Sequence, residues 1–256
     1  FTTRINETTS SKDTVKKMNF DNKKEIYCYS WNRTNNLKNF GKGLIFQNEI
    51  NLDSNNKIKK NLDFKKTDIN NNFIANLWNN YSIYFAQSIY QNYFSFFKSK
   101  QYKESFQKVI FPFIGKEFYF KLFGRKGFME SQIIVPFDKT EIFIDEVESI
   151  YKKHDPLITL YSLKNFKGEK ENLRFEDNGI CFTFDLVNNS KNQFFLNELD
   201  KVCEKHFLTP SIIKDTRLKL ETIKSCYKDY NKFKEEIYKF DNKRIYKSAL
   251  TDKLMI

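Results

Sequence analysis

Apolar residues recur along the chain with two periods, and each period predicts a type of element. Apolar positions at every second residue, or in short continuous runs, predict strands at Glu25–Trp31, Leu44–Leu52, Phe128–Pro136, Leu157–Phe166 and Gly179–Val187. Spacing of three or four residues predicts helices at Lys12–Met18, between Asp138 and Asp155, and at Gln193–His206, Leu218–Tyr227 and Asn231–Phe240. A further short strand, Ser211–Ile213, is expected between two of these helices.

The order of these elements predicts an α+β fold in one domain, residues 1–256. Leu157–Phe166 and Gly179–Val187 are separated only by a charged loop, Lys167–Asn178, so they should form an antiparallel hairpin. We therefore expect one mainly antiparallel sheet with helices packed on one face and a helical C-terminal region. The other residues before position 25 are polar, and Asp53–Asn72, rich in Asn and Lys, is expected to be a loop.

The segment Phe73–Tyr102 is almost continuously aromatic, which leaves several roles open. Asn, Gln and Ser interrupt it too often for a helix that spans a membrane. Such a run can lie on a membrane surface, line an apolar ligand groove, or fill the core of an aromatic-rich protein. All of these interpretations stay open at this point.

Composition adds positive charge without a basic tract. The 256 residues include 44 Lys and Arg against 32 Asp and Glu, which gives a net charge of +12, and the basic residues are spread along the whole chain. Lys, Asn, Ile and Phe are all frequent, as a bias of the source genome would produce, so we interpret most of the charge as background. A membrane surface or an anionic substrate stays compatible with it.

Cysteine and glycine usage argues against two kinds of site. The four cysteines are far apart and include no CxxC pair, which disfavours a structural zinc site and fits a reducing compartment. With only 7 glycines, a loop that cradles phosphates is not expected. The chain opens on Phe1 without a signal peptide and has no apolar run of transmembrane length. We therefore expect a cytoplasmic protein and a sequence that begins in mid-protein.

Polar side chains on the predicted sheet provide the candidate chemistry. They fall on strands that should be neighbours: Glu130, Gln132, Lys164, Cys181, Thr183 and Asp185. Amide, hydroxyl and ammonium groups on a face otherwise lined by aromatic residues suit a polyhydroxylated substrate. Lys214 follows the short strand Ser211–Ile213, where it can bring a cation to the end of the sheet. The simpler alternative is a surface lysine, and in either case Asp215 and Thr216 are expected to cap the helix that follows.

Motifs in one consistent order carry a family resemblance over nearly the whole chain. They are Tyr29-Ser30-Trp31 with Gly41-Lys42-Gly43, Phe111-Pro112-Phe113, Gly124 to Gln132, Leu163 to Phe166, Gly179 to Asp185, and Ile213 to Arg217 with Tyr227 downstream. In this order they resemble the C-terminal, substrate-binding half of decaprenylphosphoryl-β-D-ribose 2-oxidase and its relatives. These are FAD-dependent sugar oxidases of the vanillyl-alcohol-oxidase type. Each motif alone is weak, and the shared order makes the resemblance specific.

The resemblance implies roles for individual residues. Lys214 matches the family's catalytic lysine, beside the flavin and the sugar hydroxyl, and Ser211 would lie near the same cofactor. The substrate pocket would be lined by Trp31, Glu130, Gln132, Lys164, Phe166 and Cys181 or Thr183. A fixed ammonium would stabilise the negative charge of a reduced flavin and help to handle the hydroxyl proton.

Two departures from the family pattern change what this pocket could bind. Glu130 stands where the family carries a glutamine, and an acid there could repel a phosphate or pair with Lys164. Thr183 stands where some members carry a reactive cysteine, and Cys181 precedes it by two residues on the same face. Either residue could therefore occupy the pocket position.

The same resemblance implies an incomplete enzyme. FAD would be bound mainly by a domain that precedes this segment in the family and is absent from the sequence. The expected reaction oxidises a secondary hydroxyl of a lipid-linked or free sugar to a ketone. The expected protein partner is a short-chain reductase that completes an epimerisation. Peripheral contact with the inner face of the membrane is also expected, and nucleic acid is not expected as a partner. A different class stays open, namely a non-catalytic basic and aromatic module that binds nucleic acid or an anionic membrane surface.

Overall fold

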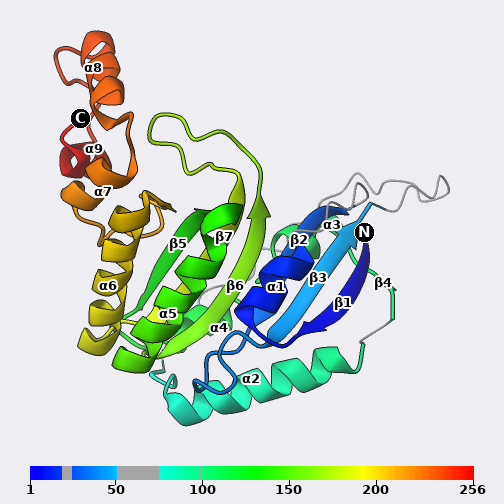
Figure 1. Cartoon of the computed structure of the whole chain (residues 1–256). Coiled ribbons are helices and arrows are strands. Elements are labelled where there is room, and N and C mark those ends of the chain that lie inside the picture. The colour runs from blue at the N-terminus through cyan, green and yellow to red at the C-terminus, as the bar shows by residue number, and fades with distance from the viewer. Residues whose placement is uncertain (19–24, 51–74, 98–99) are drawn as a thin grey trace.

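The computed structural model describes residues 1–18, 25–50, 75–97 and 100–256, and these residues form an α+β fold. Within them, an eight-stranded sheet has the order β4-β1-β3-β2-β6-β7-β5-β8, with antiparallel pairing throughout (Figure 1). Its strands are β1 (Thr2–Thr8), β2 (Glu25–Asn32), β3 (Gly43–Glu49), β4 (Tyr102–Lys103), β5 (Phe128–Pro136), β6 (Ile158–Phe166), β7 (Gly179–Val187) and β8 (Thr209–Pro210). The predicted fold class is confirmed. The loop expected at Asp53–Asn72 lies outside the described residues.

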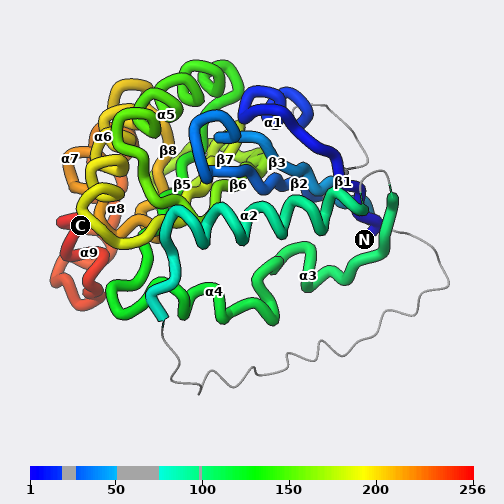
Figure 2. Tube along the Cα trace, turned by 90° about the horizontal axis from the view of Figure 1, so that it is seen from below, coloured from blue at the N-terminus to red at the C-terminus, as the bar shows by residue number. Residues whose placement is uncertain are grey.

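Helices cover both faces of the sheet, so the expectation that they pack on one face only is wrong. They are α1 (Ser11–Met18), α2 (Asn80–Ser95), α3 (Phe106–Ile110), α4 (Phe118–Lys121), α5 (Thr140–His154), α6 (Ser190–His206), α7 (Leu220–Cys226), α8 (Tyr230–Phe240) and α9 (Ala249–Leu254). Figures 1 and 2 show α1, α5 and α6 on one face and α2, α3 and α4 on the other. The α7–α9 region extends beyond α6, as the prediction of a helical C-terminal region requires (Figure 1).

The main core lies between the sheet and the helices α5 and α6. The strands contribute Ile133, Val135, Tyr161, Leu163, Phe182 and Phe184, and the helices contribute Phe143, Val147, Phe195 and Leu199, all buried. Each such side chain contributes about 1.5–3 kcal/mol through burial. Because strand residues alternate between faces, the neighbours of these apolar residues on β5, β6 and β7 point to the opposite face, as the sequence pattern predicted.

On that opposite face, α2 packs over β1, β2 and β3 through a second apolar cluster. The buried members of this cluster are Ile5, Trp31, Leu44 and Phe46. The Tyr90 ring of α2 lies 4.6 Å from the Trp31 ring, and Phe94 meets Phe46 edge-on at 5.2 Å between centroids. Aromatic contacts of this kind fix α2 against one half of the sheet.

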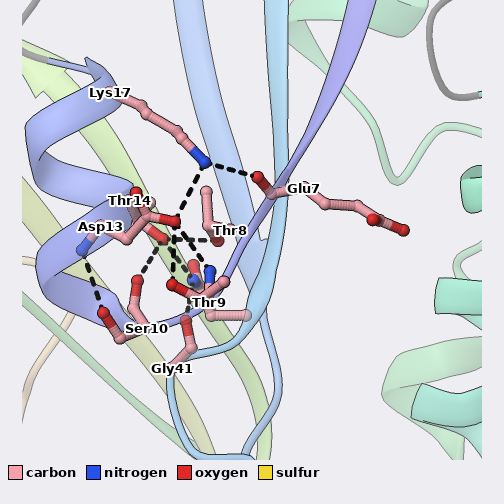
Figure 3. A network of polar contacts seen from close by, with 9 residues as sticks. Glu7, Thr8, Thr9, Ser10, Asp13, Thr14, Lys17 and Gly41 are labelled. Carbon is pink, nitrogen blue, oxygen red and sulfur yellow. Dashed lines mark hydrogen bonds and ion pairs between the residues drawn. The ribbon is translucent and has the colours of Figure 1, made fainter.

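A polar network holds α1 between β1 and the turn that joins β2 to β3 (Figure 3). The Ser10 hydroxyl accepts a hydrogen bond from the backbone N–H of Asp13 at 3.1 Å, which satisfies one free donor of the first helical turn. The Lys17 ammonium donates to the Glu7 carbonyl at 2.8 Å and pairs with Asp13 at 3.0 Å. A Cβ at Gly41 would lie 2.1 Å from the side-chain oxygen of the first α1 residue, so this close contact requires glycine.

The strand β1 was not predicted, and the reason is the small size of its inward residues. Ile5 is the one large apolar residue that β1 buries, Thr3 lies on the same face, and Thr8 is buried on the other face against α1. The Thr3 hydroxyl donates to the Asn48 side chain of β3 at 2.7 Å. A threonine-rich strand of this kind therefore becomes recognisable only beside its partner strand.

Candidate functional site

A pocket of about 910 Å³ lies on the face of the sheet that α2 and α4 cover. Side chains of β2, β5, β6 and β7 form its floor, and α2 with the segment 110–122 forms its walls. Aromatic residues dominate the lining of this pocket and include Tyr29, Trp31, Trp78, Tyr90, Phe111, Phe113, Phe118, Tyr119 and Phe120. The volume falls in the range of small-molecule sites, about 300–1,000 Å³.

Strand register brings most of the polar candidates side by side on this floor. Gln132 of β5 pairs with Thr183 of β7, which in turn pairs with Ser162 of β6. Glu130 pairs with Asp185 in the next row. Directly opposed residues of an antiparallel pair point to the same face, so these side chains share one space. All of them line the pocket.

A third row contains Lys164 and Cys181, which differ in exposure. Lys164 pairs with Cys181 and with Tyr29, lines the pocket, and makes no ion pair with any residue that the structure describes. Cys181 is buried and does not line the pocket, and its Sγ lies 3.8 Å from Oγ1 of Thr183. Burial raises the pKa of this thiol to about 12, so it stays protonated. Of the two residues that could occupy the pocket position, Cys181 and Thr183, it is Thr183 that lines the pocket.

Lys214 reaches the pocket from the turn that follows β8. Its ammonium lies 3.3 Å from Oε2 of Glu130, and Oε1 of Glu130 accepts a hydrogen bond from the Gln132 amide at 2.7 Å. The Lys214 side chain is 52% exposed, whereas that of Glu130 is 16% exposed. The acid that distinguishes this chain from the family pattern therefore pairs with Lys214 rather than with Lys164.

The strand predicted at Ser211–Ile213 is displaced in the structure, so this prediction is wrong in position. The short strand β8 is Thr209–Pro210, and only one further bond, from the backbone N–H of Ser211 to the carbonyl of Gln132 at 2.8 Å, continues the pairing. The chain then turns, with the N–H of Asp215 bonded to the carbonyl of Ser211 at 3.1 Å, and Ile213 is 75% exposed. Lys214 is therefore held on a turn, not at a strand end.

An ion-pair cluster fixes this turn. The Arg217 guanidinium contacts the Asp200 carboxylate of α6 at 2.6 and 2.9 Å and the Asp215 carboxylate at 2.8 Å. The predicted helix cap from Asp215 and Thr216 is wrong, because α7 begins at Leu220 without a side-chain cap. Asp215 instead pairs with the largely buried Arg217 guanidinium.

Trp31, Phe166 and Ser211 take three different positions. Trp31 lines the pocket and is almost fully buried against α2. Phe166, at the end of β6, does not line the pocket and meets Phe175 edge-on at 5.7 Å. Ser211 is buried outside the lining, and its hydroxyl accepts a hydrogen bond from the backbone N–H of Lys214 at 3.3 Å. Ser211 thus supports the turn that carries Lys214.

The structure adds a carboxyl–phenol pair that sequence reasoning did not select. Asp185 is buried on the pocket floor, and its Oδ2 accepts a hydrogen bond from the Tyr119 hydroxyl at 3.1 Å. The Tyr119 oxygen also lies 2.6 Å from Oγ1 of Thr159. Burial, with the nearby charge of Glu130, raises the pKa of Asp185 to about 7. In the sequence, Asp185 was one of the polar candidates on the predicted sheet and ended one of the motifs, but nothing there pointed to Tyr119.

These groups suit recognition of a neutral or anionic polyhydroxylated molecule. Hydroxyl, amide, carboxyl and ammonium groups converge within aromatic walls, as sites for small polar ligands require. The half-exposed ammonium of Lys214 can contact an anionic group of a ligand. Among the residues that the structure describes, no cluster of His, Cys, Asp or Glu is arranged to hold a metal ion.

Two further findings concern the membrane and known proteins. None of the described helices is both long enough and apolar enough to cross a bilayer. A scan against protein-family models and a search among curated proteins find no match to the sequence, so the family resemblance stays a prediction.

Proposed function

We propose that this chain is the substrate-binding half of an FAD-dependent oxidoreductase that oxidises a secondary hydroxyl of a sugar to a ketone. One observation supports the proposal most strongly. Residues chosen for this role come from separate segments of the chain, and the structure brings six of them to one pocket, namely Trp31, Glu130, Gln132, Lys164, Thr183 and Lys214. A random set of polar strand residues would divide between the two faces of the sheet.

The polar floor suits a sugar. Gln132, Ser162 and Thr183 offer an amide and two hydroxyl groups in one row, which can donate to and accept from neighbouring sugar hydroxyls. Aromatic walls can stack on the apolar faces of the ring. Lys164, which has no counter-ion among the described residues, can balance a phosphate or another anionic group on the substrate. A lipid-phosphate-linked pentose, or a related aldonolactone, would satisfy these groups.

Charge and proton handling would fall to Lys214 and Asp185. A bound flavin would supply the acceptor for the hydride that leaves the carbinol carbon. Lys214 would place positive charge near that acceptor, while Glu130 orients its ammonium. Asp185 is a buried carboxyl whose pKa of about 7 allows it to accept the hydroxyl proton near neutral pH.

The test uses the protein expressed together with the sequence encoded upstream of Phe1. We expect this longer protein to bind flavin and to be reduced by a sugar under anaerobic conditions, followed by flavin absorbance. Lys214→Ala should slow reduction by about 10²–10³-fold, the effect of removing one transition-state charge contact. Lys191→Ala is the matched control, because Lys191 is also half-exposed and paired with one carboxylate, Asp155 at 2.7 Å.

Two results would contradict the proposal. The first is a longer protein that binds no flavin. The second is a longer protein that binds flavin but whose flavin is reduced by the sugar at the same rate in the Lys214→Ala variant, the Lys191→Ala variant and the unmodified protein.

A further inference from the structure

The helix α2 carries apolar side chains on both of its faces. Ile83, Tyr90 and Phe94 point inward and pack on the sheet or line the pocket. Six further residues point outward and are 53–88% exposed; we call them the outer stripe of α2, and they are Tyr81, Tyr84, Phe85, Ile89, Tyr93 and Phe96. At about 100° per residue, these six fill the side of the helix opposite the buried residues.

The outer stripe differs from the surface of other helices in this protein. The α2 sequence, NYSIYFAQSIYQNYFS, contains no charged residue, and only Asn, Gln, Ser and Ala separate its apolar positions. The long helix α6, on the other side of the sheet, instead exposes Lys191, Lys201 and Lys205. Contiguous exposed apolar surface of this kind marks an interaction site in a folded protein.

Two cations lie against rings of the outer stripe. The Arg33 guanidinium lies 5.9 Å from the centre of the Tyr84 ring, and the Lys100 ammonium lies 4.7 Å from the centre of the Phe96 ring. Residues 100–126, which include α3 and α4 on the same side of the sheet, contain seven Lys or Arg and two Glu (Figure 2). A neutral aromatic stripe with two cations against its rings and a basic segment on the same side of the sheet is complementary to lipid headgroups of negative charge.

We propose that the outer stripe of α2 binds the surface of an anionic bilayer. Tyrosine and phenylalanine rings would enter the headgroup region, and Arg33, Lys100 and the lysines of the following segment would contact lipid phosphates. Figures 1 and 2 show α2 along the outside of the molecule, so the stripe can meet a flat surface. The inner face of the same helix lines the pocket, so binding would hold the pocket at the membrane. This inference does not depend on the proposed flavin chemistry.

Vesicle co-sedimentation tests the proposal. We expect the protein to bind vesicles of equal parts phosphatidylcholine and phosphatidylglycerol, and to bind pure phosphatidylcholine vesicles more weakly. The double variant Phe85→Ser, Phe96→Ser should weaken binding to the mixed vesicles at least about tenfold, because two apolar side chains no longer enter the bilayer. Lys100→Gln should weaken it by about fivefold, the effect of one cation near an anionic surface.

A matched control separates the stripe from exposed aromatics in general. Phe194 on α6 is 60% exposed, and Phe194→Ser should leave vesicle binding unchanged. All of these side chains are exposed, so each variant should keep the thermal unfolding curve of the unmodified protein. The proposal would be overturned if the protein bound both kinds of vesicle equally well, or if the double variant bound the mixed vesicles as well as the unmodified protein does. A third result would also overturn it. If the unmodified protein binds no vesicles but forms a dimer in size-exclusion chromatography, and the double variant is a monomer, the stripe is a contact between protein copies.

Discussion

The sheet face that looks toward α2, α3 and α4 has two halves with different cover. On β1, β3 and β2, this face buries Ile5, Trp31, Leu44 and Phe46 under the rings of α2, and each of these four side chains is at most 7% exposed. On β6, β7 and β5, the same face carries Ser162, Lys164, Thr183, Asp185, Gln132 and Glu130, which line the pocket. We call these the aromatic half and the polar half.

The difference between the halves separates stability from ligand recognition. Polar side chains on a sheet face lose free energy unless water or a ligand satisfies them, whereas apolar rings under a helix contribute to folding directly. We therefore expect substitutions in the aromatic half to lower the free energy of unfolding strongly. Substitutions in the polar half should mainly change titration and binding.

The largest expected effect is in the aromatic half. Phe46→Ala removes a ring that is 1% exposed and contacts Tyr29 and Phe94, so it should lower the free energy of unfolding by about 3–5 kcal/mol. Chemical denaturation measures this change. Ser162→Ala in the polar half is the comparison, with an expected change below about 1 kcal/mol. Similar losses for both variants would break the distinction between the halves.

The next effect is a pH dependence that belongs to Asp185. The pKa of this carboxyl is about 7 in the folded protein and near its ordinary value in the unfolded chain, so the folded state binds the extra proton. The contribution of Asp185 to the free energy of unfolding is therefore fully present below about pH 4 and decreases as the pH rises to about 7. Above pH 7 this contribution is lost. Asp185→Asn removes the penalty and should raise the free energy of unfolding at pH 8 by about 2–4 kcal/mol.

A second buried acid provides the control for Asp185→Asn. Asp200 is also buried but holds the Arg217 guanidinium at 2.6 and 2.9 Å. Asp200→Asn should therefore destabilise the protein at pH 8, the opposite sign. Denaturation curves at pH 5 and pH 8 for both variants decide the matter, and a loss of stability in Asp185→Asn at pH 8 would contradict the prediction.

The sequence predicted the fold well wherever local periodicity specifies it. The strands β5, β6 and β7 and the helices α5 and α6 follow clear periods, and the α+β class followed from their order. Predictions failed where a contact across the fold decides the structure. β1 depends on pairing with β3, and the turn at Ser211 to Asp215 depends on the salt bridges of Arg217 with Asp200 and Asp215.

The candidate site shows the same limit. Alternation correctly grouped Glu130 with Gln132, and Thr183 with Asp185, because residues two apart on a strand share a face. Alternation does not say which residues of that face are covered, so it could not separate Thr183 from Cys181. Tyr119 comes from a short helix 66 residues before Asp185, and no local pattern connects the two. The carboxyl–phenol pair therefore required the structure.

Tyr119→Phe sharpens the assignment of Asp185 with a moderate effect. The phenol hydroxyl stabilises the ionised carboxylate, so its removal should raise the pKa of Asp185 further and lower the free energy of unfolding by about 1 kcal/mol. Carboxyl carbon shifts in NMR follow this titration. Tyr90→Phe is the control, because Tyr90 also lines the pocket but its hydroxyl bonds to none of the described residues. An unchanged titration of Asp185 in Tyr119→Phe would contradict the hydrogen bond.

The smallest effect on stability concerns the ion pair between Lys214 and Glu130. Because the Lys214 side chain is 52% exposed, the pair should contribute less than about 1 kcal/mol, so Glu130→Gln should hardly change chemical denaturation. The opposite face of β1 and β3 offers a matched pair, Arg4 and Glu49 at 3.4 Å and 46% and 22% exposed, and Glu49→Gln should have a similarly small effect. The two variants should differ in titration, because Glu130 raises the pKa of Asp185 and its neutralisation should lower that pKa. If Glu130→Gln instead costs as much stability as Phe46→Ala, the polar half is part of the structural core, and its residues need no ligand to explain them.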